Sequence, residues 1–279
     1  MIHQILIALD DDTDTPVATR YAAEIAQRFD AQITGVAVVD MGSIATSAKG
    51  GGIGAIYMMD KVEAALTASA RAVARRLLDE FRAAMADAGV QYEAFVQEGV
   101  PVERIVEDMN YCDLLVIGKE PHFYYSHPAA TSMTLEQVFK HIVGPVLLVP
   151  DRYREIRRVL VAFDGSPQCV RSLRAFLYLK PFGTDVAVDI VNIHGRGERE
   201  GSQLVLRQAQ GYVQKHGFHA DFHSIASADR DEEISGVAER FGADLVVAGA
   251  HVVSKLARLF GSTTASLLAK ATVPLWLEN

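Results

Sequence analysis

The chain has 279 residues, of which 49% are hydrophobic and 22% charged, a composition typical of soluble globular proteins. This length predicts about two domains. The formal net charge of −8 argues against a general nucleic-acid surface, because neutralising phosphates requires clustered Lys and Arg. No apolar run approaches the roughly 18 residues of a membrane span, and no signal-peptide pattern opens the sequence. We therefore expect a cytoplasmic protein that binds neither nucleic acid nor membrane, with both cysteines as reduced structural thiols.

The first half of the chain alternates strand and helix patterns. The nearly continuous apolar run 3–9 predicts a strand covered on both faces. Thr15 and Pro16 then open a helix whose apolar residues keep helical spacing to Phe29. This order, with short connections, predicts parallel strands and right-handed crossovers. Further strands are expected at 32–39, 92–97, 113–117 and 145–149, and further helices at about 59–87, 101–109 and about 134–142.

The second half follows the same order of elements. It is shorter, chiefly because the first half carries an extra segment of about 20 residues around 41–60. Strands are expected at 158–163, 185–193, 219–225, 244–248 and 273–277, and helices at 167–179, about 200–216, 231–241 and about 262–270.

Three apolar runs of the first half recur in the second half in the same order. The first run ends in an aspartate in both halves, Asp10 and Asp164, and the second run ends in a glycine, Gly118 and Gly249. Three recurrences in register indicate two copies of one domain, so any functional site must be sought twice. The matching segments are 5–10 and 159–164, 112–118 and 243–249, and 144–150 and 273–277.

Several of these segments match one known family. Asp164-Gly165-Ser166, after the first strand of the second copy, matches the opening signature of the universal stress protein family. The strand-four pattern Asp-Leu-Val-Val-x-Gly and the closing Pro-Val-Leu-Leu-Val pattern match as well. Gly99 and Pro101 resemble the exit of that family's third strand. The chain thus resembles a tandem universal stress protein over nearly all of both halves.

The resemblance implies a fold class and a domain organisation. We expect an α/β protein with one copy at 1–151 and the other at 152–279. Each copy should be a Rossmann-like open parallel sheet of five strands in the order 3-2-1-4-5. The two should pack as an intramolecular pseudo-dimer through their fifth strands, 145–149 and 273–277, because each apolar last strand would otherwise leave an exposed edge. Whether two such chains form a homodimer is left open.

The resemblance also implies a nucleotide site in the second copy. Nucleotide-binding members hold ATP with the loop Gly-x2-Gly-x9-Gly-Ser/Thr after strand four, the aspartate after strand one and a backbone contact from strand two. Mg²⁺ is expected only together with the nucleotide, and no other metal. The implied site consists of Ala162, Phe163, Asp164 and Ile193 near base and ribose, and of Gly249, His251, Val252, Gly261, Ser262 and Thr263 toward the phosphates.

This loop departs from the family pattern, which leaves two interpretations open. Val252 stands at the second glycine, and eight residues separate it from Gly261. A β-branched residue resists the positive φ that glycine adopts beside a phosphate. The start of the expected helix nevertheless favours an anion, through free N–H groups and the helix dipole. Alternatively, Ser262 and Thr263 only cap that helix.

The first copy lacks the loop. After Gly118 the chain has no second or third glycine of the pattern, and Thr134 stands where Gly-Ser would be. Three adjacent carboxylates, at 10–12, follow its first strand, and like charges oppose a triphosphate unless a cation intervenes. We expect a solvated capping turn there rather than an Mg²⁺ site, and no ATP. The roles of the Gly-rich loop 50–54 and the aromatic loop 122–127 are left open.

The sequence favours a stress-response protein that binds an adenine nucleotide, ATP, in its C-terminal domain. The alternative is a nucleotide-free interaction or scaffold protein of the same fold. Neither a Gly-x-Ser-x-Gly nor a Gly-x-Gly-x-x-Gly motif follows a strand, so we expect no catalysis beyond, at most, slow ATP hydrolysis. His216, His219 and His223 lack the carboxylate or cysteine spacing that would indicate zinc.

Overall fold

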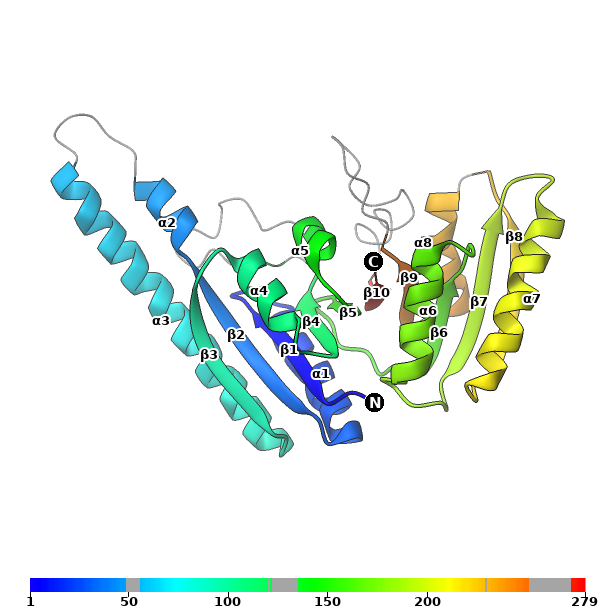
Figure 1. Cartoon of the computed structure of the whole chain (residues 1–279), viewed down its shortest axis with the longest axis horizontal. Helices are drawn as coiled ribbons and strands as arrows, with labels where there is room; N and C mark the ends of the chain where they lie inside the picture. Colours follow the sequence, from blue (N-terminus) through cyan, green and yellow to red (C-terminus); the bar gives the residue numbers. More distant parts are fainter. Residues whose placement is uncertain (49–55, 120, 122–134, 229, 251–271, 279) are drawn as a thin grey trace. The chain divides into compact units, whose positions relative to one another are not determined.

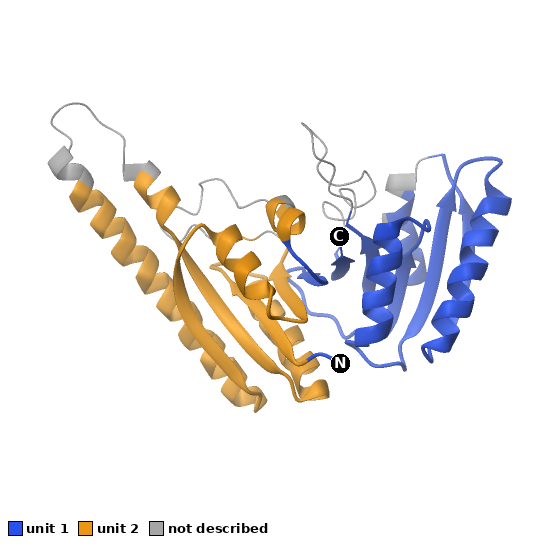
Figure 2. Ribbon diagram, viewed as in Figure 1, with its two compact units in different colours: residues 1–2, 142–279 blue, residues 3–141 orange. Residues whose placement is uncertain are grey.

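The computed structural model describes residues 1–48, 56–119, 121, 135–228, 230–250 and 272–278. The chain divides into two compact units (Figure 2). The first comprises residues 3–141, and the second comprises residues 142–279 together with residues 1–2. The division falls before the last strand of the first copy. The domain boundary at 151/152 stays a prediction from the sequence repeat.

The first unit is a parallel sheet with helices on both faces. Its strands run in the order β3-β2-β1-β4. Helices α1 and α3 lie on one face, and α4 lies on the other (Figure 1). The predicted α/β class and the order of its first four strands are confirmed. The elements are β1 (Gln4–Leu9), α1 (Thr15–Phe29), β2 (Gln32–Asp40), α2 (Met41–Ala48), α3 (Ile56–Ala88), β3 (Tyr92–Gly99), α4 (Pro101–Met109), β4 (Leu114–Gly118) and α5 (Leu135–His141).

Helix α2 is an element that the sequence analysis does not predict. Its sequence contains Gly, Ser, Thr and Ile, which are weak helix formers. Asp40, the last residue of β2, compensates by capping the helix. Its Oδ1 accepts a hydrogen bond from Ser43 N (3.0 Å), and its Oδ2 accepts one from Ser43 Oγ (2.6 Å). The Gly-rich loop 50–54 lies outside the described residues.

The second unit contains a mixed sheet in the order β5-β10-β9-β6-β7-β8. Its last five strands repeat the predicted order 3-2-1-4-5, which is thereby confirmed for the second copy. Helices α6 and α7 lie on one face and α8 on the other (Figure 1). The elements are β5 (Val146–Val149), β6 (Arg158–Ala162), α6 (Pro167–Leu179), β7 (Ala187–His194), α7 (Arg199–Lys215), β8 (Ala220–Ala226), α8 (Arg230–Phe241), β9 (Leu245–Gly249) and β10 (Leu275–Glu278). The helix expected at about 262–270 lies outside the described residues.

Strand β5 belongs to the second unit because it pairs with β10. The two strands are antiparallel, with Leu148 opposite Leu275 and Leu147 opposite Trp276. On its other side β10 pairs with β9 in parallel. Trp276 is fully buried, and its ring lies 5.9 Å from that of Phe176 on α6. The predicted pairing of the two fifth strands is confirmed.

The repeat is visible in matching hydrogen bonds as well as in strand order. Asp113, just before β4, accepts hydrogen bonds at Oδ2 from the backbone N–H groups of His3 (2.7 Å) and Gln4 (3.1 Å). Asp244, just before β9, accepts the equivalent bonds from residues 157 (3.1 Å) and 158 (3.0 Å). In both copies the aspartate of the Asp-Leu pattern therefore fixes the start of the first strand.

No helix within the described part of the chain is long and apolar enough to cross a membrane.

Candidate functional site

The carboxyl ends of β6, β7 and β9 define the candidate site of the second unit. Strand β6 lies between β7 and β9, and the chain order reverses across it. In open α/β sheets, ligands bind at such a reversal, outside the carboxyl ends of the strands. Five of the predicted residues lie at this edge, and the rest, within 251–271, lie outside the described residues. The five are Ala162, Phe163, Asp164, Ile193 and Gly249.

Asp164 begins the tight turn that joins β6 to α6. Its Oδ1 accepts a hydrogen bond from Ser166 N (2.8 Å), and Gly165 between them has a φ of 80°. Ser166 Oγ in turn accepts from Cys169 N (3.3 Å) in the first turn of α6. Burial raises the pKa of Asp164, but hydrogen bonds from Ser166 and neighbouring donors outweigh it, so the net pKa lies below its ordinary value. The exposed carboxylate is therefore anionic at neutral pH.

Gly249, at the end of β9, packs directly against the first turn of α6. A Cβ built on it would lie 2.5 Å from Cys169 N and 2.7 Å from the carbonyl carbon of Gln168. Nearby, Ser172 Oγ donates to the carbonyl oxygen of Ala248 (2.7 Å). The close approach of α6 to β9 is thus sufficient by itself to require glycine at this position. A phosphate contact of Gly249 stays a prediction.

The backbone of Ile193 extends past the last residue of β6. The register of β6 and β7 ends at the pair Ala162 and Val191. Phe163 N still donates to Val191 O (2.9 Å), and beyond Phe163 the chain turns toward α6. In a parallel ladder, a residue turns its N–H and C=O toward one neighbouring strand, and the next residue turns them toward the other. Like Val191, Ile193 therefore directs its backbone N–H and C=O toward the β6 side of β7. At the level of Ile193, β6 has already ended.

Two polar residues beside Ile193 are missed by the sequence analysis. Asn192 is buried, and its Nδ2 donates to Phe163 O (2.7 Å), which holds the end of β6 against β7. His194 is also buried, and its Nδ1 lies 2.8 Å from Gly195 O. A signal was available in the repeat, because the first copy has apolar residues at both equivalent positions.

The equivalent edge of the first unit is more deeply buried. Alignment of the strand registers places Val38 and Val39 of β2 at the positions of Ile193 and His194. Both valines are completely buried, whereas Ile193 is only half-buried. Gly118 also packs closely, but against the Asp14 carboxyl group just before α1 and not against helix backbone, since a Cβ there would collide with that group.

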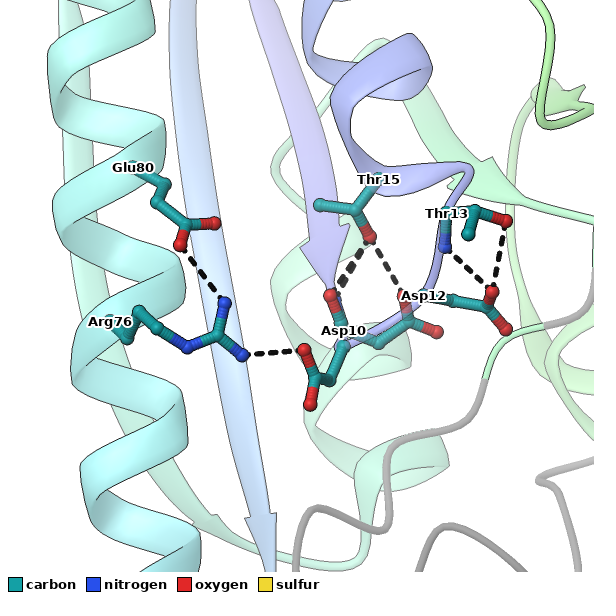
Figure 3. Close-up of polar contacts among 7 residues, drawn as sticks. Asp10, Asp12, Thr13, Thr15, Arg76 and Glu80 are labelled. Atoms are coloured by element: carbon teal, nitrogen blue, oxygen red, sulfur yellow. Dashed lines mark hydrogen bonds and ion pairs between the residues drawn. The ribbon is translucent and has the colours of Figure 1, made fainter.

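The side chains of the acidic turn at residues 10–12 contact other residues of the first unit (Figure 3). Asp10 is buried, and its Oδ1 accepts from Thr15 Oγ1 (2.7 Å), so the expected solvated turn is wrong for this residue. Asp11 forms an ion pair with Arg76 of α3 (2.5 Å), whose guanidinium also contacts Glu80. Among the described residues, no three His, Cys, Asp or Glu side chains are arranged to hold a metal ion.

A second charged cluster, also missed from the sequence, lies within the second unit's sheet. Asp189 of β7 is buried, and its carboxylate binds Arg158 Nε of β6 (2.7 Å) and His223 Nε2 of β8 (2.9 Å). Asp189 is in register with Leu160 in the middle of β6, so this cluster lies away from the carboxyl edge. It ties three strands together and gives His223 a structural role.

Comparison with known proteins defines the class of this chain. The model of the universal stress protein family matches residues 1–150 and again residues 155–277. The chain therefore belongs to the universal stress protein family, in tandem form, and the resemblance drawn from its motifs is confirmed. This membership supports a role in the stress response.

Individual relatives agree with that assignment. The universal stress protein Slr1230 of Synechocystis sp. is 28% identical over 163 residues, which are 58% of this chain and 56% of that protein. The alignment thus spans little more than half of that relative. A universal stress protein structure from Archaeoglobus fulgidus shares the fold at 17% identity, with a TM-score of 0.70 over 99% of this chain and 98% of that chain. Protein PA1789 of Pseudomonas aeruginosa does so at 15% identity, with a TM-score of 0.60 over 99% and 92%.

Proposed function

We propose that the second unit binds one adenine nucleotide, ATP, at the carboxyl ends of β6, β7 and β9. The observation that carries the proposal is the backbone of Ile193, which directs a donor and an acceptor past the end of β6. An N–H and a C=O side by side complement N1 and the 6-amino group of adenine, which accept and donate in the same order. Asn192 holds this end of β6 in place through Phe163 O.

In this proposal, Asp164 contacts the ribose or a phosphate-bound cation. Its carboxylate is anionic and exposed, and it is positioned by the Ser166 N–H. A carboxylate accepts hydrogen bonds from hydroxyl groups and provides oxygen ligands to Mg²⁺, which would arrive with the nucleotide. From Gly249 the chain continues into the segment with His251, Val252, Gly261, Ser262 and Thr263, which we assign to the phosphates.

The proposal includes at most one nucleotide per chain. In the first unit, Val38 and Val39 are completely buried where the second unit has the half-buried Ile193 and a polar neighbour. The carboxylates of its acidic turn would also repel a triphosphate.

The experiment has two parts. Mass spectrometry of gently denatured protein should release co-purified adenine nucleotide, and titration with fluorescent ATP should give no more than one site per chain. Asp164→Asn should weaken ATP binding about tenfold, since hydrogen bonds to charged groups exceed neutral ones. Asp185→Asn, at an exposed aspartate preceding β7, is the matched control and should leave affinity unchanged.

Failure to bind would favour the other candidate function, a nucleotide-free interaction protein. The sequence observation behind it is Val252, together with the shortened spacing to Gly261. Two equivalent sites, or tight binding that Asp164→Asn does not affect, would contradict the proposed site.

A further inference from the structure

His194 is a buried imidazole at the end of β7 with one ring nitrogen engaged. Its Nδ1 lies 2.8 Å from the carbonyl oxygen of Gly195. A carbonyl oxygen only accepts hydrogen bonds, so Nδ1 carries the proton and donates. In the neutral ring this fixes Nε2 as an acceptor. No hydrogen bond joins Nε2 to another of the described residues.

The position of His194 places this acceptor near the proposed base. Side chains alternate along a strand, so His194 lies on the same face of β7 as Asn192. The Asn192 amide reaches the carbonyl oxygen of Phe163, where β6 ends. His194 lies one strand step further, beyond the end of β6 and next to the backbone of Ile193.

The fold itself does not require a polar side chain at this position. The first unit has the same strand order here, and the residue equivalent to His194 is Val39, which is completely buried. Within the described residues, Nε2 is not among the buried side-chain atoms that lack a hydrogen-bond partner, so it keeps contact with solvent and a ligand can reach it. A polar side chain where the first unit has a valine, with an accessible acceptor beside Ile193, favours a ligand contact over a packing role.

We infer that His194 is a specificity-determining residue that accepts a hydrogen bond, at Nε2, from the 6-amino group of the bound purine. This inference rests on the proposed function. The 6-amino group has two hydrogens, of which one would reach the carbonyl of Ile193 and the other His194. Purines with a 6-oxo group present an acceptor at this point, so they would set two acceptors against each other and are rejected.

The test compares the affinities of the whole chain for ATP and for ITP, its 6-oxo analogue, by calorimetric titration. The wild-type chain should prefer ATP. His194→Leu should reduce the ratio of the two dissociation constants about tenfold, a typical value for a lost hydrogen bond with its unpaired partner. His194→Gln keeps an acceptor and should retain most of the preference. His219→Leu, at an exposed histidine before β8, is the matched control and should not change the ratio.

The outcomes separate this inference from the proposed function. Binding of ATP with the same preference in His194→Leu and His194→Gln as in the wild type overturns the role of His194 alone. Equal affinity of the wild type for ATP and ITP would overturn this role together with the adenine contact proposed for Ile193, because N1–H and the 6-oxo group of inosine match neither backbone group. Absence of nucleotide binding in the wild type overturns both. Thermal melting of each variant checks that it is folded, and the Gln variant provides the comparison if the Leu variant is not.

Discussion

Gly249 illustrates how a motif glycine can serve packing. Any side chain here would meet the backbone of the first turn of α6 at 2.5 Å from Cys169 N. Gly249→Ala should therefore lower the free energy of unfolding by about 1–3 kcal/mol, as overpacking of a core typically does. Gly211→Ala is the control, because nothing lies within 4 Å of a Cβ at that position in α7. It should raise stability by about 0.5–1 kcal/mol. Urea denaturation measures both, and equal effects would contradict the packing argument.

The two cysteines should be unreactive thiols at neutral pH. Burial and the nearby Asp108 and Asp113 carboxylates raise the pKa of Cys112 to about 11, and burial raises that of Cys169 above its ordinary value. Only the thiolate reacts with iodoacetamide. Alkylation of Cys112 in the folded protein should thus be slow at pH 8 and rise about tenfold per pH unit up to about 11. A plateau near pH 8.5, measured by peptide mass spectrometry, would show that the thiol is not perturbed.

Val252 is the residue that separates the two candidate functions. If its β-branched side chain prevents a phosphate contact, Val252→Gly with one residue inserted before Gly261 should restore the family spacing and strengthen ATP binding. Adding Asp164→Ala should then weaken binding about tenfold or more. Val252→Ala, which removes the branching without providing glycine's freedom, is the control. Tight binding by the wild type with no effect of the repair would mean that the loop holds phosphate in another way.

At the scale of elements, β6, β7 and β8 are joined by the single buried carboxylate of Asp189. Arg158→Met should destabilise the protein by about 1–3 kcal/mol, because it leaves that carboxylate with one partner instead of two. Arg157→Met is the neighbouring control. Arg157 pairs with Glu155 at the surface, where ion pairs contribute little, so its denaturation midpoint should not move. Equal midpoints for both variants would show that the Asp189 cluster does not stabilise the protein.

Much of the secondary structure could be predicted, because its signals are local. Pro16, Pro101 and Pro167 mark helix starts, and α1, α4 and α6 begin at or next to them. Helix α2 was not predictable, since its stability depends on a cap from the preceding strand and not on its own composition. Uniform apolar runs predicted every buried strand, with boundaries within a few residues.

The site was predictable only in part, because its polar contacts join residues far apart in sequence. Asp164, Ile193 and Gly249 follow from motif and strand order. The buried Asp10 was missed, since a run of three aspartates suggests exposure until Thr15 is seen to bind it. Asp189 was missed because its partners lie 31 and 34 positions away. Asn192 and His194 would have emerged from a residue-by-residue comparison of the two copies.

At the scale of the whole molecule, β5 completes the second unit although it belongs to the first copy in sequence. A fragment of residues 142–279 should therefore be more stable and less prone to aggregate than one of residues 152–279, which exposes the apolar edge of β10. Thermal melting and light scattering at matched concentrations measure the difference. A fragment of residues 142–279 with Leu147→Lys, opposite Trp276, should behave like the shorter one. Equal behaviour of the two wild-type fragments would show that β5 is dispensable.

The placement of β10 also orders the assembly of the second unit. β5 and β9 lie earlier in the chain than residues 275–278, so a ribosome makes both of them before it makes β10. β10 then inserts between these two strands, because it has β5 on one side and β9 on the other. Until it does, the edges of β5 and β9 that face β10 are open. A truncation that removes residues 275–278 would thus delete a strand from within a sheet and separate β5 from β9.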